Sequence, residues 1–136
     1  MDKRSDFIEE HEIIERELLE LETVMECEDI NHANLAHVLR KIYGIWNNHT
    51  EKENQFFLSL QQQGIKVPLK NGRYYNSIQS HLNSLFNSML SGSENMTRVS
   101  LEVHGNALIS EIRDRMKDEG WILYALPTIQ ETIPNE

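Results

Sequence analysis

A single apolar stripe, interrupted by a histidine and a glutamate, constrains the fold of this chain more than any other feature. Between residues 33 and 62, apolar side chains recur at three- and four-residue spacing, in the order Leu35, Val38, Ile42, Ile45, Phe56 and Leu60. This spacing is typical of the buried face of a helix, and His49 and Glu53 lie on the same face, one turn apart. A core accepts a carboxylate only where another group compensates its charge. The stripe therefore predicts a buried polar site that other parts of the chain complete.

Three further segments show helical periodicity, and no segment shows the alternation typical of a strand. The predicted helices span residues 5–25, 33–62, 74–90 and 96–126, and Pro127 ends the last of them. Four helices joined by short turns favour an all-α fold, an up-down-up-down antiparallel four-helix bundle over residues 1–127. The tail, residues 128–136, has no amphipathic pattern and is expected to be loosely held.

Polar residues on the inward faces of all four predicted helices would meet at one end of such a bundle. His11 lies early in the first helix, His81 early in the third, and Glu119 late in the fourth. Because neighbouring helices run in opposite directions, these positions fall at about the level of His49 and Glu53. We therefore predict that the five residues form one site.

The remaining polar residues have simpler interpretations. His32, His37 and His104 belong to the opposite end of the predicted bundle and are interpreted as capping, surface or packing histidines. Acidic residues around the other faces of the first helix are interpreted as a solvated surface; they are Glu9, Glu10, Glu12 and Glu17. A lone inward histidine is usually a hydrogen-bonded core residue. The convergence of three histidines with two carboxylates is what favours a ligand site.

The overall charge and the cysteine content exclude several classes of function. A net charge of −9 argues against nucleic acid or an anionic membrane as a partner. Cys27 is the single cysteine, so the chain forms no intramolecular disulfide and suits a reducing compartment. The sequence shows neither the apolar run of a signal peptide nor an apolar stretch of the roughly 20 residues that span a membrane. We expect a cytoplasmic protein.

The chemistry of the predicted site points to a metal ion. Imidazole and carboxylate groups together are ligands for transition metals such as iron, manganese or zinc. The core of a four-helix bundle is a recurrent place for such centres, with ligands projecting inward from facing helices.

Four local motifs carry a resemblance to a known family. They are His11-x-x-x-Glu15, His49-x-x-x-Glu53 before Phe56-Phe57-Leu58, the lone His81, and Asp118-Glu119 before Ile122-Leu123-Tyr124. Together they resemble the hemerythrin-like (HHE cation-binding) domain, over nearly the whole chain. The resemblance is most specific in the second helix.

The resemblance implies a non-haem iron centre of one or two ions, with zinc or manganese as alternatives. By resemblance, His11, His49 and His81 would be terminal ligands, and Glu53 and Glu119 bridging ligands. Members of the family bind oxygen reversibly, sense oxygen or redox state, store or repair iron, or handle nitric oxide. The implied partners are therefore a metal ion and dioxygen or another small diatomic gas.

The chain departs from the family pattern in its fourth helix. Where the family repeats a histidine one turn before the glutamate, this chain has Arg115 before Glu119. The ligand set is therefore incomplete, with Glu15, Asp114 and Asp118 as auxiliary candidates. The guanidinium of an arginine is permanently charged and can neutralise a carboxylate where a metal would otherwise do so.

Two hypotheses from different functional classes follow. The favoured one is a metal-binding protein that senses oxygen, redox state or nitric oxide, or handles iron. The alternative is a metal-free, degenerate hemerythrin-like bundle that acts as an interaction or regulatory module, with Arg115 supplying the positive charge. An enzyme that activates oxygen at iron is the less favoured third reading, because no separate substrate-binding motif is present.

Overall fold

The computed structural model of the chain describes residues 3–66 and 71–125, which are helical apart from short turns. The elements are α1 (Lys3–Glu26), α2 (His32–Gln62), α3 (Asn71–Leu90), α4 (Glu94–Ser100), the π-helix η1 (Leu101–Gly105) and α5 (Asn106–Ala125). Because α4, η1 and α5 follow one another without a break, they form one long helix where residues 96–126 were predicted. The all-α prediction is confirmed for the described residues, which contain no strand. The predicted tail lies outside them.

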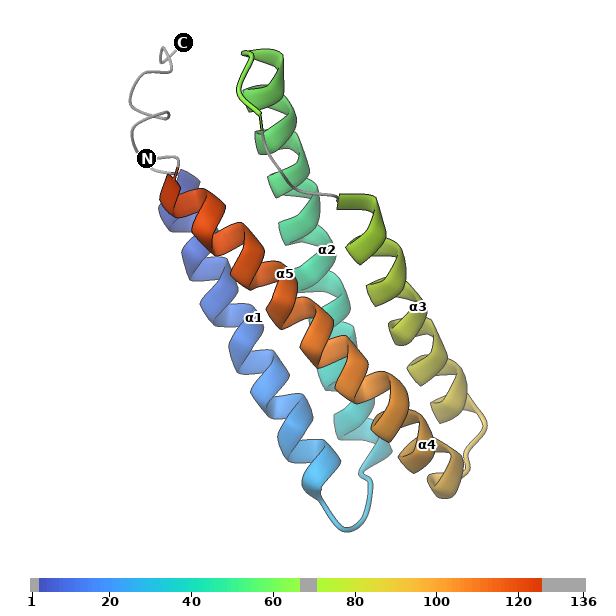
Figure 1. Ribbon diagram of the computed structural model, residues 1–136. Helices are drawn as coiled ribbons and strands as arrows, with labels where there is room; N and C mark the ends of the chain where they lie inside the picture. The colour runs from blue at the N-terminus through green and yellow to red at the C-terminus, as the bar shows by residue number, and fades with distance from the viewer. Residues whose placement is uncertain (1–2, 67–70, 126–136) are drawn as a thin grey trace.

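Four helical rods lie side by side, formed by α1, α2, α3 and the continuous α4–η1–α5 (Figure 1). α1 packs against α2 and α5, while α3 packs against α2 and against all three parts of the last rod. Side-chain caps define two of the helix starts. Asn31 accepts a hydrogen bond from the backbone N–H of Asn34, and Ser93 accepts one from that of Met96. These caps set where α2 and α4 begin and hence the level at which their side chains meet the other rods.

A layer of buried polar residues divides the hydrophobic core into two clusters. The smaller cluster consists of Phe7, Phe57, Leu60, Ile122 and Leu123. The larger cluster fills the rest of the interior and contains residues from all four rods. The polar layer falls between the two clusters in three helices: His11 between Phe7 and Ile14, His49 and Glu53 between Trp46 and Phe57, and Arg115 and Glu119 between Ile112 and Ile122.

An arginine of α4 closes the end of α1. The guanidinium of Arg98 donates hydrogen bonds to the carbonyl oxygens of Met25, Cys27 and Glu28, each at 2.8 Å. The last carbonyl groups of a helix have no partner within it, and a cation there also interacts favourably with the helix dipole. This contact joins the first rod to the last.

Replacing Arg98 by alanine should lower the free energy of unfolding by about 1–3 kcal/mol, because hydrogen bonds from a charged donor contribute in that range. Urea denaturation followed by circular dichroism measures the change. The exposed Arg40 of α2 is the control, and Arg40→Ala should cost less than about 0.5 kcal/mol. Equal effects of the two substitutions would show that the contacts of Arg98 are not structural.

Candidate metal centre

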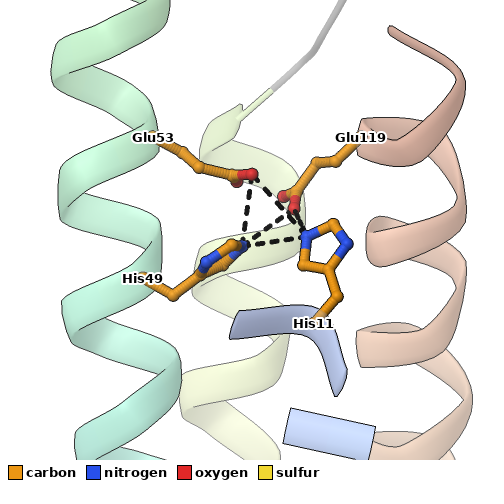
Figure 2. Close-up of side chains that lie close together, drawn as sticks. All are labelled: His11, His49, Glu53 and Glu119. Atoms are coloured by element: carbon orange, nitrogen blue, oxygen red, sulfur yellow. Dashed lines mark hydrogen bonds and ion pairs between the residues drawn. The ribbon is translucent and has the colours of Figure 1, made fainter. Parts of the chain in front are cut away.

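Four side chains from three helices point at one another in the space between the helical rods (Figure 2). His11 comes from α1, His49 and Glu53 from α2, and Glu119 from α5. Each offers one ligand atom, and these four atoms all lie within 4.8 Å of one another. This is the convergence predicted from the inward polar positions, for four of the five residues.

The separations between these atoms are short and similar. The Nε2 atoms of His11 and His49 are 3.1 Å apart. Oε1 of Glu119 lies 2.8 Å from His11 Nε2 and 3.0 Å from His49 Nε2. Oε2 of Glu53 lies 3.7 Å and 3.2 Å from the same two nitrogens.

These separations match the spacing of ligands around a single ion. Ligand atoms about 2.0–2.2 Å from a common metal stand about 3.3–3.6 Å apart in a tetrahedron, and about 2.8–3.1 Å apart when adjacent in an octahedron. The nitrogen–nitrogen and nitrogen–oxygen separations of 2.8–3.7 Å cover both arrangements, and all four ligand atoms lie within 4.8 Å of one another. The site can therefore hold one metal ion without a large movement of its ligands.

The site is shielded from water, and the carboxylate of Glu53 lacks hydrogen-bond partners among the described residues. The side chains of Glu53 and Glu119 are fully buried, and that of His11 is 14% exposed. Neither carboxylate oxygen of Glu53 has a hydrogen bond within the described part of the chain, although His49 lies close to it. A buried carboxylate without hydrogen bonds is costly. Coordination to a cation would satisfy it.

An outer carboxylate fixes the orientation of His49. Nδ1 of His49 donates a hydrogen bond to Oε1 of Glu10 at 2.7 Å, and Lys52 also donates to Glu10. Partial burial raises the pKa of Glu10, but the bonds from Lys52 and His49 outweigh this and hold it below its usual value. With the proton held at Nδ1, the lone pair of Nε2 is directed at the site, as in the carboxylate–histidine pairs that support metal ligands.

Glu10 contacts the site, although its position in the sequence predicted only a solvated surface. Its position one residue before His11 places it beside the inward face of α1, within reach of His49 on α2. The sequence offers no signal that separates it from its acidic neighbours.

Arg115 lies inside the site, as the hypothesis of a surrogate cation required. Its side chain is 2% exposed, and its Nε donates to Oε2 of Glu119. Oε1 of Glu119 faces the two histidines, so this carboxylate is shared between the arginine and the site. Burial raises the pKa of Glu119, but hydrogen bonds from His11 and His49 lower it well below its usual value.

His81 is not part of this group, which corrects the prediction of a five-residue site. Nε2 of His81 lies 2.8 Å from Glu111, and its Nδ1 lies 3.0 Å from Nδ1 of His104. The buried face of α3 runs through Ile78, Leu82 and Leu85, which leaves His81 on the flank toward η1 and α5. His81 thus lies at the level of His104, which was predicted to belong to the opposite end, so His81 and not His104 departs from its predicted level.

The auxiliary candidates also lie apart from the ligand group. Glu15 accepts two hydrogen bonds from Arg113, at 3.1 and 2.7 Å. Asp114 is exposed and Asp118 is half-buried, and the ligand group found in the described residues includes neither. The site therefore has four candidate ligands and one internal arginine.

No family model, no curated protein and no solved structure matches this chain. Within residues 3–66 and 71–125, no helix is long and apolar enough to cross a membrane. The geometry of the chain's own residues is therefore the basis on which its function can be inferred.

Without a metal ion, protons supply positive charge to the site. Burial lowers the pKa of His49, but the nearby carboxylates of Glu119 and Glu53 outweigh it and raise that pKa to about 10. The pKa of His11 is raised for the same reason. Burial and the adjacent Glu119 raise the pKa of Glu53.

The raised pKa of His49 predicts how the stability of chelator-treated protein depends on pH. A folded-state pKa of about 10, against 6.5 for an ordinary histidine, stabilises the fold fully below pH 6.5. This stabilisation is lost as the pH rises through about 10. Denaturant midpoints measured from neutral to alkaline pH should therefore fall more steeply in wild type than in His49→Gln. The exposed His37→Gln variant is the control and should follow wild type; identical curves for all three proteins would contradict the assignment.

Proposed function

We propose that this chain is a hemerythrin-like metal-binding protein, an up-down-up-down four-helix bundle that holds one divalent transition-metal ion, iron in the first place. The observation that carries the proposal is the convergence of four ligand atoms from three helices within 4.8 Å. Two imidazoles and two carboxylates suit iron, manganese and zinc. The family resemblance of the motifs around these residues favours iron.

The charges around the site support one ion rather than two. The carboxylates of Glu53 and Glu119 balance one divalent cation, and the guanidinium of Arg115 adds a fixed positive charge beside them. A second cation would meet that charge in a buried, weakly screened environment, where repulsion is strong. With His81 elsewhere, the described residues also leave a second ion without a histidine of its own.

The function that such a centre supports is sensing or handling of a small redox-active molecule, in the reducing cytoplasm. Bound iron would supply the redox chemistry and the open coordination positions that dioxygen or nitric oxide require. The chain's own residues exclude water, orient His49 through Glu10, and hold Glu119 through Arg115. His11, the most exposed of the four ligands, is on the side nearest to solvent.

The alternative function is a metal-free bundle that acts as an interaction or regulatory module. The pairing of Arg115 with Glu119 and the raised pKa values of both histidines favour it, because together they can compensate the carboxylates without a metal. The two functions differ in what stabilises the fold.

Removal of the metal by a chelator distinguishes the metal-binding protein from the metal-free module. If the site holds a metal, a metal ion present at about 100 times its dissociation constant stabilises the folded state by about 2.7 kcal/mol. For a domain of this size, removing that stabilisation lowers the melting temperature by roughly 10 °C. Protein purified without chelator should therefore contain about one metal ion per chain by elemental analysis, and EDTA should lower its melting temperature. Added iron or zinc should restore it.

Single substitutions assign the effect to the site. His49→Ala should remove both the bound metal and the response to EDTA, whereas the exposed His37→Ala should retain both. An unchanged melting temperature after verified metal removal would favour the metal-free module instead.

The arginine gives a second test. Arg115→His removes the fixed charge and restores the histidine that the family has one turn before the glutamate, so the metal content should rise from one ion toward two. Arg113→His is the matched control, because Arg113 lies on the same helix but pairs with Glu15 and Glu22. It should leave the metal content unchanged. Two ions per chain in wild type would show that Arg115 does not limit the site.

A further inference from the structure

The exposed surface of α3 carries no charged side chain between residues 76 and 90. The sequence contains no Asp, Glu, Lys or Arg between Arg73 and Glu94, although charged residues make up 26% of the chain. Uncharged polar and apolar side chains therefore take the exposed positions of this stretch. They are Asn76, Ser80, Asn83, Asn87 and Leu90.

The neighbouring rod adds an exposed apolar stripe to this surface. Met96, Val99 and Val103 follow one another at three- and four-residue spacing, and each is more than half exposed. The helices that carry them, α4 and η1, lie beside α3 (Figure 1). The three side chains line a cavity of about 360 Å³ together with Ser88 of α3. Apolar side chains at helical spacing normally face a core, and a group of them left exposed within polar surroundings marks an interaction site.

These residues together form what we call the uncharged face, which consists of the exposed positions of α3 and the stripe on α4 and η1. Its composition is that of the centre of a protein interface, where charged residues are depleted. The face therefore suits another protein surface that is also uncharged.

The charge of the rest of the chain determines which partner fits the uncharged face. The chain has a net charge of −9, and the exposed surface of α1 includes Glu9, Glu12 and Glu20. Two copies of the chain repel each other where such acidic surfaces approach. Two uncharged faces meet without that repulsion. A cationic partner gains no attraction from this face and would be drawn to the acidic surface of α1 instead.

We propose that the uncharged face is the interface of a homodimer. A two-fold axis lets the same face serve both copies, so that the stripe of each copy is covered by the other. From Asn76 to Leu90 the face is about 21 Å long, and two adjacent helices make it about 20 Å wide. This area is at the low end for specific association. The dimer is therefore weak, with a dissociation constant of about 100 µM.

The dimer is independent of the metal centre. The four candidate ligands lie on α1, α2 and α5, and the uncharged face belongs to α3, α4 and η1. Failure of the chain to bind a metal therefore leaves this proposal untouched, and the reverse also holds.

Sedimentation equilibrium of the wild-type chain tests the dimer and its dependence on salt. Between about 10 µM and 1 mM protein, the average mass should rise from that of a monomer toward that of a dimer. Raising NaCl from about 0.05 M to 0.5 M should strengthen the dimer at least about threefold, because salt screens the repulsion between two acidic chains. A chain that stays monomeric at the highest concentration, or a dimer that salt weakens, would overturn the proposal.

A matched pair of substitutions assigns the association to the stripe. Val99→Glu should weaken the dimer at least about tenfold, because it places a negative charge in the interface of both copies. Leu19→Glu on α1 is the control, since Leu19 is 51% exposed and Val99 is 54% exposed. Both variants add one negative charge, but Leu19→Glu should associate nearly as wild type does. Equal weakening by the two substitutions would show that association does not depend on the uncharged face.

NMR spectra locate the interface without any substitution, so the proposal stays testable if Val99→Glu does not fold. Between dilute and concentrated wild-type protein, the amide signals of Asn83, Asn87, Val99 and Val103 should shift, and that of Leu19 should not. Concentration-dependent shifts confined to α1 or α2 would contradict the assignment.

Discussion

The compensation of two buried carboxylates is the constraint on which the rest of this structure depends. Glu53 and Glu119 are fully buried between two hydrophobic clusters, where an uncompensated charge would cost several kcal/mol. Side chains from three helices compensate these charges: His11 from α1, His49 from α2 and Arg115 from α5. The same contacts therefore fix the rotation and the level of these helices relative to one another. A buried ion pair seldom adds much net stability over apolar packing; its contribution here is to make one arrangement of the rods the satisfied one.

The residues that contact the ligands from outside the group either orient a ligand or balance its charge. Glu10 holds the ring of His49 by its Nδ1 proton, and Lys52 keeps Glu10 ionised by donating to it. Arg115 takes one oxygen of Glu119 and leaves the other to the two histidines. His49 and Glu119 thus each have a partner outside the ligand group that limits their movement. Glu53 is the ligand whose oxygens lack hydrogen bonds in the described part of the chain, and it is therefore the one that gains most from a bound cation.

Periodicity and helix direction were sufficient to predict four helices and the convergence of four of the five residues expected to form one site. They were insufficient for His81, because Ile78 and Leu85 are compatible with a face through residue 81 and with one through Leu82. Spacings of three and four residues fit both faces, and the rotation of α3 is decided by its neighbours rather than by its own sequence. Phe56 and Phe57 present the same ambiguity, and the structure buries Phe57 more deeply. Glu10 and Arg98 act across helices through long, flexible side chains, and no local pattern in the sequence reports such contacts.

Protons and a divalent ion compete for the same ligand atoms at this site. Without a metal, the raised pKa of His49, about 10, means that this imidazole holds a second proton at neutral pH, and the pKa of His11 is raised as well. A divalent cation bound to Nε2 of both histidines would displace that proton and take over the compensation of the carboxylates. The fold would thus be assembled before the metal arrives, unlike small zinc domains that are unfolded without their ion. A preformed site of this kind takes up metal at the expense of protons, so its occupancy is governed by the acidity and the metal content of the surroundings rather than by folding.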